Sequence, residues 1–174
     1  MSHVIKVNDE TYRQLNVFAG EFRKASGRPV SMSAVVSRLL DRKNVENMKE
    51  RIAIALKKRQ EIAVCYLFGS MARSGKGADV DVGILLKAGA VPDTRYEGKV
   101  AVELESAGVR GADVRILNNA SLRFLSQVMR YGTIVFSNDE NARVEFESLT
   151  MKRFMDMKAF HDEYDSTRTK RLIS

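Results

Sequence analysis

Residues 66–86 read YLFGSMARSGKGADVDVGILL, and this stretch decides what kind of fold the chain adopts. An apolar run ends in Gly69 and Ser70, a polar loop follows, and Asp79 and Asp81 then open a second apolar run. Residues two apart in a strand point to the same side, so we expect both carboxylates to project together from the start of a buried strand. Two carboxylates held close together repel unless a cation lies between them, and Mg²⁺ prefers oxygen ligands. The stretch therefore predicts a magnesium site.

The neighbouring sequence supplies the other groups that such a site needs. Two-metal sites position both the attacking and the leaving oxygen, and they generally need a further carboxylate. Asp113 is the best candidate because it starts the next apolar run, and an adjacent strand would bring it beside the pair. On the other side, the Gly69 backbone, the Ser70 hydroxyl and Arg73 can hold a phosphate, with Lys76 as a weaker candidate.

Helices and strands alternate over the second part of the chain. Apolar runs predict strands at residues 62–68, 80–86, 112–117 and 133–136, and periodic apolar positions predict helices at 96–107, at 122–131 and from 139 onward. This order favours an α/β (α+β) fold, in which a mixed sheet carries helices on its faces.

The motif resembles a known family. Phe68-Gly69-Ser70-Met71-Ala72-Arg73, followed by Asp79-Val80-Asp81, is similar to the signature of the nucleotidyltransferase superfamily that includes DNA polymerase β. The short chain, with the run from Asp113 to Leu117, looks most like the minimal nucleotidyltransferases, over about residues 45–165. The resemblance implies that Gly69 and Ser70 hold the triphosphate of an NTP. It also implies that Asp79 and Asp81 bind two Mg²⁺ ions, and that Asp113 completes the metal site and deprotonates or orients the acceptor hydroxyl.

The resemblance also implies a reaction and a partner. Family members transfer a nucleoside monophosphate, usually AMP from ATP, and release pyrophosphate. Many minimal members are antitoxins that adenylylate a tyrosine of a HEPN-type toxin, so such a toxin is an implied partner. The loop departs from the family pattern at Ser74 and Ala78 and is about two residues shorter than in many members. These departures leave the acceptor and the rate open. The choice between ATP and another NTP is also open, because base recognition in such sites is loose and spread over many positions.

The N-terminal segment has a different pattern. Residues 3–8 suggest a short strand, and two amphipathic helices follow, separated by a turn with Gly27 and Pro29. Residues 41–47 are polar and read as a linker or a helix junction, so we divide the chain into residues 1–43 and 44–174. The first part is similar to the ribbon-helix-helix family of dimeric DNA-binding proteins.

In that family a two-stranded ribbon, one strand from each chain, enters the DNA major groove. The similarity implies that Ile5 and Val7 face the dimer core, whereas Ser2, Val4 and Lys6 face the bases. The alternative is a helical hairpin that only dimerises or covers the catalytic part.

The net charge, the cysteine count and the hydropathy limit the possible partners and the cellular location. The net charge is +7, and residues 1–61 hold 13 lysine and arginine residues against 7 acidic ones, which directs any contact with a polyanion to this part. Cys65 is the only cysteine and lies in an apolar run, as expected for a cytoplasmic protein. No apolar run approaches the roughly 20 residues that a bilayer needs, and the first residues lack the pattern of a signal peptide.

Three functions stay open at this point. The first is a Mg²⁺-dependent nucleotidyltransferase of the antitoxin type. The second is a DNA-binding repressor whose nucleotidyltransferase domain is inactive or only senses nucleotide. The third combines both, with a homodimeric N-terminal part that represses and a C-terminal part that modifies a toxin.

Overall fold

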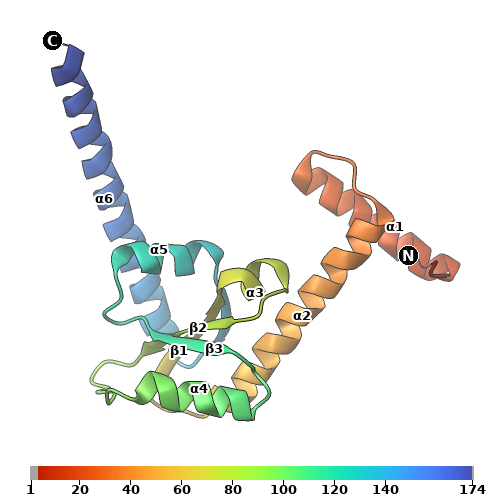
Figure 1. Cartoon of the computed structure of the whole chain (residues 1–174), viewed down its shortest axis with the longest axis horizontal. Coiled ribbons are helices and arrows are strands. Elements are labelled where there is room, and N and C mark those ends of the chain that lie inside the picture. The colour runs from red at the N-terminus through yellow and green to blue at the C-terminus, as the bar shows by residue number, and fades with distance from the viewer. Residues whose placement is uncertain (1–3, 174) are drawn as a thin grey trace.

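The chain forms a sheet with helices on both faces, and two long helices extend away from it (Figure 1). The structure is a computed structural model, and it describes the backbone of residues 4–173 and the side chains through residue 157. The helices in this range are α1 (Asp9–Ser26), α2 (Met32–Leu56), α3 (Gly69–Ser74), α4 (Tyr96–Ser106), α5 (Leu122–Tyr131) and α6 (Glu140–Ile173). The strands are β1 (Ile62–Phe68), β2 (Val80–Leu86), β3 (Ala112–Ile116) and β4 (Thr133–Ser137).

The sheet is mixed, as predicted. Its strand order is β3-β2-β1-β4, and β1 runs antiparallel to both of its neighbours. The β2–β3 pair is parallel and is joined through α4, so it forms the crossover unit that parallel pairs require. The α/β (α+β) fold class predicted from the sequence is confirmed.

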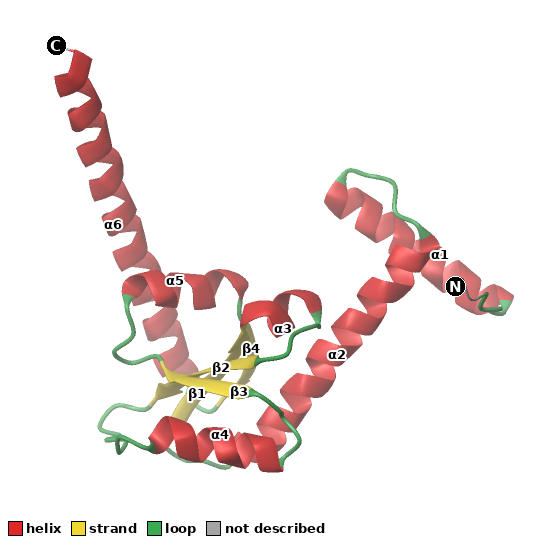
Figure 2. Ribbon diagram, viewed as in Figure 1, coloured by secondary structure: helices red, strands yellow, loops and turns green. Residues whose placement is uncertain are grey.

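Two apolar clusters hold the helices against the two faces of the sheet (Figure 2). One face packs against α4 and the C-terminal half of α2, and it receives Val80, Val82 and Ile84 of β2. The other face packs against α5 and α6 and receives Leu85. Since side chains alternate along a strand, Asp81 lies on the α5–α6 side of the sheet. The helices in the described part of the chain lack the combined length and hydropathy that a bilayer crossing requires.

Local signals set the two N-terminal helices. Asn8 caps α1 by accepting a hydrogen bond from the Thr11 N–H at 2.8 Å, and α1 ends at Gly27, whose φ of 66° is left-handed. Ser31 caps α2 by accepting from the Ala34 N–H at 3.2 Å. Each of these boundaries agrees with the sequence pattern.

The N-terminal part differs from the sequence expectation in two ways. Residues 4–8 form no strand, because a ribbon strand has no neighbour to pair with inside a single chain. Residues 41–47 are helical, so α2 continues across the proposed boundary between residues 43 and 44, and that division stays a prediction. Ser2, expected to face DNA bases, lies outside the described residues.

Candidate active site

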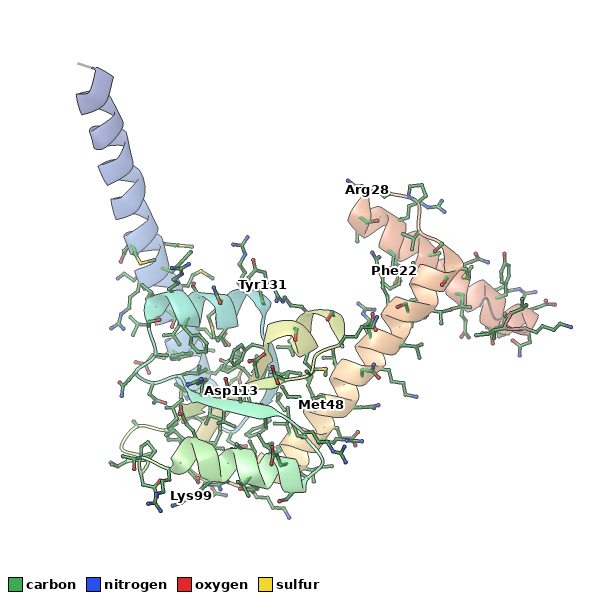
Figure 3. All side chains as sticks on the ribbon, viewed as in Figure 1. Phe22, Arg28, Met48, Lys99, Asp113 and Tyr131 are labelled. Atoms are coloured by element: carbon green, nitrogen blue, oxygen red, sulfur yellow. The ribbon has the colours of Figure 1, made fainter. Side chains whose placement is uncertain are left out.

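The three predicted acids gather at one edge of the sheet. In the parallel β2–β3 pair, Asp81 lies directly opposite Asp113, and residues in register on neighbouring strands project to the same face. Asp79 lies two residues before Asp81, so its place in the alternation is the same, although it falls just outside β2. Asp113 lies on β3, in the middle of the molecule (Figure 3). The sequence prediction that a neighbouring strand brings Asp113 beside the pair is therefore confirmed.

The glycine of the motif lies against this cluster. Gly69 opens α3 with a φ of 72°, and a Cβ atom built on it would lie 1.8 Å from Oδ2 of Asp81. No side chain fits there, so the residue must be glycine both for its backbone conformation and for its contact. The glycine-serine turn and Asp81, which lies twelve residues after Gly69 in the sequence, therefore form a single site.

The loop between the turn and the acids folds back over Ser70. A Cβ atom on Gly77 would lie 2.5 Å from the Ser70 Oγ and 3.2 Å from the Asp79 carbonyl oxygen. The Ser74 hydroxyl donates to the Ser70 carbonyl at 2.9 Å and contacts the Lys76 carbonyl at 3.1 Å. Ser74, which departs from the family pattern, therefore closes the end of α3 in this chain.

Charge shapes the acid cluster. Partial burial, and then the carboxylates of Asp113 and Asp79, raise the pKa of Asp81, and Arg115 offsets part of this effect. Nη2 of Arg115 lies 3.3 Å from Oδ2 of Asp113, so the two side chains form an ion pair. The carboxylates of Asp79, Asp81 and Asp113 thus oppose one another's ionisation around Asp81.

The donor set suits a hard cation, but it is not drawn together around one point. Carboxylate oxygens are the ligands that Mg²⁺ takes in proteins, and the side chain of Asp113 is half exposed and open to a ligand. Within residues 4–157, no three histidine, cysteine, aspartate or glutamate side chains have the close spacing of a formed metal cluster.

Two cationic residues of the motif have different surroundings. The Nε of Arg73 donates to the Gly69 carbonyl at 3.3 Å, and its guanidinium carbon lies 5.6 Å from the centroid of the Tyr131 ring. Lys76 pairs with Asp41 of α2 at 3.1 Å, so it binds the loop to α2. Tyr131 was missed as a neighbour of the motif, because nothing in the sequence relates the end of α5 to α3.

These features define a nucleotidyltransferase-type fold, in which a glycine-serine turn after β1 lies beside an acid pair at the start of β2 and a third acid lies on β3. The family model described as "Polymerase beta, Nucleotidyltransferase" matches residues 50–141, which is more than half of the chain. The chain belongs to this family, and its enzyme class is nucleotidyltransferase. Among proteins of curated function, none matches the chain.

Solved structures share the fold. A chain of a toxin–antitoxin crystal structure with AMP-PNP is 20% identical with a TM-score of 0.54, and the match covers 70% of this chain and 95% of that one. A chain from the complex of tri-AMPylated Shewanella oneidensis HEPN toxin with MNT antitoxin is 19% identical with a TM-score of 0.51, covering 72% and 96%. A chain of the toxin–antitoxin MntA–HepT is 19% identical with a TM-score of 0.50, covering 71% and 96%. At these identities the likeness concerns the fold.

Proposed function

We propose that this chain transfers AMP from ATP to an acceptor hydroxyl and releases pyrophosphate, with Asp79, Asp81 and Asp113 as its catalytic acids. The observation that carries the proposal is the meeting of Gly69, Asp81 and Asp113. The glycine leaves no room for a Cβ beside Asp81, and Asp113 lies opposite Asp81 in the strand register. Triphosphate and carboxylates would then meet at one place.

Each residue has a role in this reaction. The Gly69 backbone and the Ser70 hydroxyl hold the triphosphate, and Arg73 adds a fixed positive charge next to them. Asp79 and Asp81, with Asp113, would hold two Mg²⁺ ions. Such ions, when bound, polarise the transferred phosphate and stabilise the leaving pyrophosphate. Asp113 takes the proton of the acceptor hydroxyl, whose oxygen bonds to the α-phosphorus as the bond from that phosphorus to the bridging oxygen of the β-phosphate breaks. Arg115 keeps the Asp113 carboxylate in place.

The acceptor we propose is a hydroxyl of a HEPN-type toxin, with this chain as the cytoplasmic antitoxin. Support comes from the structural neighbours, one of which is a complex of tri-AMPylated HEPN toxin with MNT antitoxin. The described helices include no candidate membrane span, and the single cysteine is buried and unpaired with another cysteine.

Label transfer tests the proposal. The chain is incubated with Mg²⁺, ATP labelled at its α-phosphate, and a HEPN-type toxin. We expect labelled toxin, and a loss of rate of about 100- to 1,000-fold in Asp79→Asn, Asp81→Asn and Asp113→Asn. Glu105→Gln, an exposed acid on α4, is the matched control and should keep the wild-type rate. Undiminished labelling in the aspartate variants would remove the site assignment.

A second candidate function is binding of DNA by a homodimer through residues 1–43. The observation that favours it is the exposure of apolar side chains near the N-terminus. Ile5 is 78% exposed and Val4 is 89% exposed in the single chain. A second copy would cover Ile5 and Val7 and leave Val4 and Lys6 facing DNA. Analytical ultracentrifugation and a gel shift with duplex DNA at low salt test this, and Lys6→Ala should weaken the shift. A monomer without a shift would exclude the repressor function.

A further inference from the structure

A positively charged groove lies where α1, α2 and α3 meet. It has a volume of about 620 Å³ and is lined by Phe22 of α1, Arg38 and Arg42 of α2, and Arg73 of α3, among others. A second groove of about 600 Å³ lies next to it at the α1–α2 turn, where it shares Arg38 with the first groove and is also lined by Arg28. Phe22 and Arg28 mark this hairpin in Figure 3. We call the two together the arginine groove.

The arginines of the groove carry uncompensated charge. Among the described residues, none of Arg38, Arg42 and Arg73 has a carboxylate within 4.0 Å. The two acids in the lining are already paired with lysines, since Asp41 lies 3.1 Å from Lys76 and Glu46 lies 3.2 Å from Lys49. The groove thus has a surplus of fixed positive charge that a ligand with carboxylates would complement.

The arginines are held in a row. Arg38 and Arg42 are four residues apart on α2, so they lie on one face about 6 Å apart along the helix. Their guanidinium carbons lie 5.0 and 5.8 Å from the centroid of the Phe22 ring. Arg73 continues the row on α3, where its Nε donates to the carbonyl of Gly69 in the candidate active site. The row therefore leads from the hairpin to the catalytic turn.

The wall of the groove is fixed to α2. Gly75, at the end of α3, packs so closely on α2 that a Cβ atom would lie 2.2 Å from the Asp41 carbonyl oxygen. The Asn44 side chain donates to the Gly75 carbonyl at 3.4 Å. With the Lys76–Asp41 pair, these contacts hold the hairpin and the catalytic helix at a set distance.

We propose that the arginine groove docks an acidic, partly apolar segment of the partner protein that carries the acceptor hydroxyl, an inference that rests on the proposed function. Phe22, Val45 and Ala72 give the groove apolar surface for side chains of a protein. This apolar surface favours a protein segment, whose acidic side chains can reach the arginines while its neutral side chains lie against Phe22, Val45 and Ala72. Docking there brings the partner next to Arg73 and Gly69.

The groove is built partly from residues inside the family match, such as Arg73, and partly from residues before it. Its residues Phe22, Arg38 and Arg42 precede residue 50, where the family match begins. The structural neighbours are matched over about 95% of their own length but over only 70–72% of this chain. Part of the groove therefore lies outside the residues that the family model matches.

Peptide binding tests the proposal without relying on catalysis. The probes are a fluorescein-labelled 12-residue peptide of glutamate, aspartate and leucine, and a labelled dT12 oligonucleotide, each titrated into the full chain by fluorescence anisotropy. We expect the peptide to bind, and to lose about tenfold or more in affinity in Arg38→Gln/Arg42→Gln, which keeps side-chain length but removes charge. Arg38→Lys/Arg42→Lys should retain most of the affinity. Arg13→Ala/Arg23→Ala, two exposed arginines of α1 outside the groove, is the charge-matched control.

The outcomes separate this proposal from the proposed function. Equal peptide affinity in the glutamine variant and the wild type would overturn the groove as a docking site. Tighter binding of dT12 than of the peptide, lost in the same variant, would replace the protein partner with a nucleic acid and also overturn it. Asp79→Asn should bind the peptide like the wild type even if label transfer fails in every variant. With a toxin that is labelled, the glutamine variant should raise KM for the toxin about tenfold and leave kcat unchanged.

Discussion

The contact between Gly69 and Asp81 gives the most demanding test of the site. In Gly69→Ala the new Cβ would lie 1.8 Å from Oδ2 and 2.7 Å from Cγ of Asp81. Real Cβ atoms do not approach other atoms closer than 3.0 Å, so the carboxylate must move by more than about 1 Å. The substitution therefore displaces the proposed catalytic acid Asp81 without altering any ionisable group.

The structure gives two separable magnitudes for this substitution. Alanine at a φ of 72° costs about 1–2 kcal/mol, which lowers Tm by roughly 2–8 °C for a chain of this size. A shift of about 1 Å in a reacting group can cost about 100-fold in rate. We therefore expect a modest loss of stability in Gly69→Ala and a large loss of label transfer.

Gly89→Ala separates the two effects. Gly89 has a φ of 81°, but a Cβ atom on it meets nothing within 4 Å. This variant carries the same kind of backbone strain and leaves Asp81 in place. Thermal denaturation followed by circular dichroism should give similar losses in Tm for both variants, whereas transfer of α-labelled AMP should fall only in Gly69→Ala. If Gly69→Ala and Gly89→Ala transfer AMP at rates within about threefold of each other, the position of Asp81 against Gly69 does not matter for the reaction, and the proposed role of this contact is refuted.

Three further predictions follow from other parts of the molecule. Burial and neighbouring carboxylates raise the pKa of Asp81, so the folded chain loses stability as the pH rises from about 4 through that pKa. Asp81→Asn should therefore have a higher Tm than the wild type at pH 7 and the same Tm as the wild type below about pH 4. An equal Tm at pH 7 would contradict the crowding of Asp81 by Asp113. Arg59→Ala breaks hydrogen bonds of 2.6 and 2.9 Å to Glu103. Arg59 precedes β1, whereas the candidate site follows it, so the substitution should lower the free energy of unfolding by about 1–3 kcal/mol in chemical denaturation and leave AMP transfer by the folded protein at the wild-type rate. Cys65 is fully buried and its pKa is raised, so iodoacetamide should modify it only after unfolding, and rapid labelling of native protein would refute its burial.

The local half of the site was predictable from the sequence. Alternation along a strand is a property of the backbone, so the shared side of Asp79 and Asp81 followed from their spacing alone. Asp113 was found because it opens an apolar run, and β3 indeed lies beside β2. The register of Asp81 opposite Asp113 was not predictable, because side-chain packing on two faces and the α4 crossover set it together.

The N-terminal part was less predictable, because tertiary contacts override its local pattern. From the sequence, residues 41–47 are interpreted as a linker or a helix junction, because they are mostly polar. Asp41 and Asn44 instead make polar contacts with the loop after α3, and Val45 and Met48 pack against the core. These contacts keep α2 helical from Met32 to Leu56. Residues 4–8 form no strand in the single chain, because the expected partner strand belongs to a second copy.

The features that weaken the isolated fold are concentrated where the proposed reaction occurs. Partial burial and the carboxylates of Asp113 and Asp79 raise the pKa of Asp81. The residue that contacts Asp81, Gly69, has a left-handed backbone and no room for a side chain. Neither feature stabilises the folded chain. Asp81→Asn would remove the charge repulsion, and a turn with more space would remove the close contact at Gly69. Folded proteins keep unfavourable local arrangements mainly at functional sites, where a ligand supplies the missing compensation. A cation with a triphosphate would neutralise the acids and occupy the space beside Gly69, so binding of both together should raise Tm in the wild type and fail to do so in Gly69→Ala.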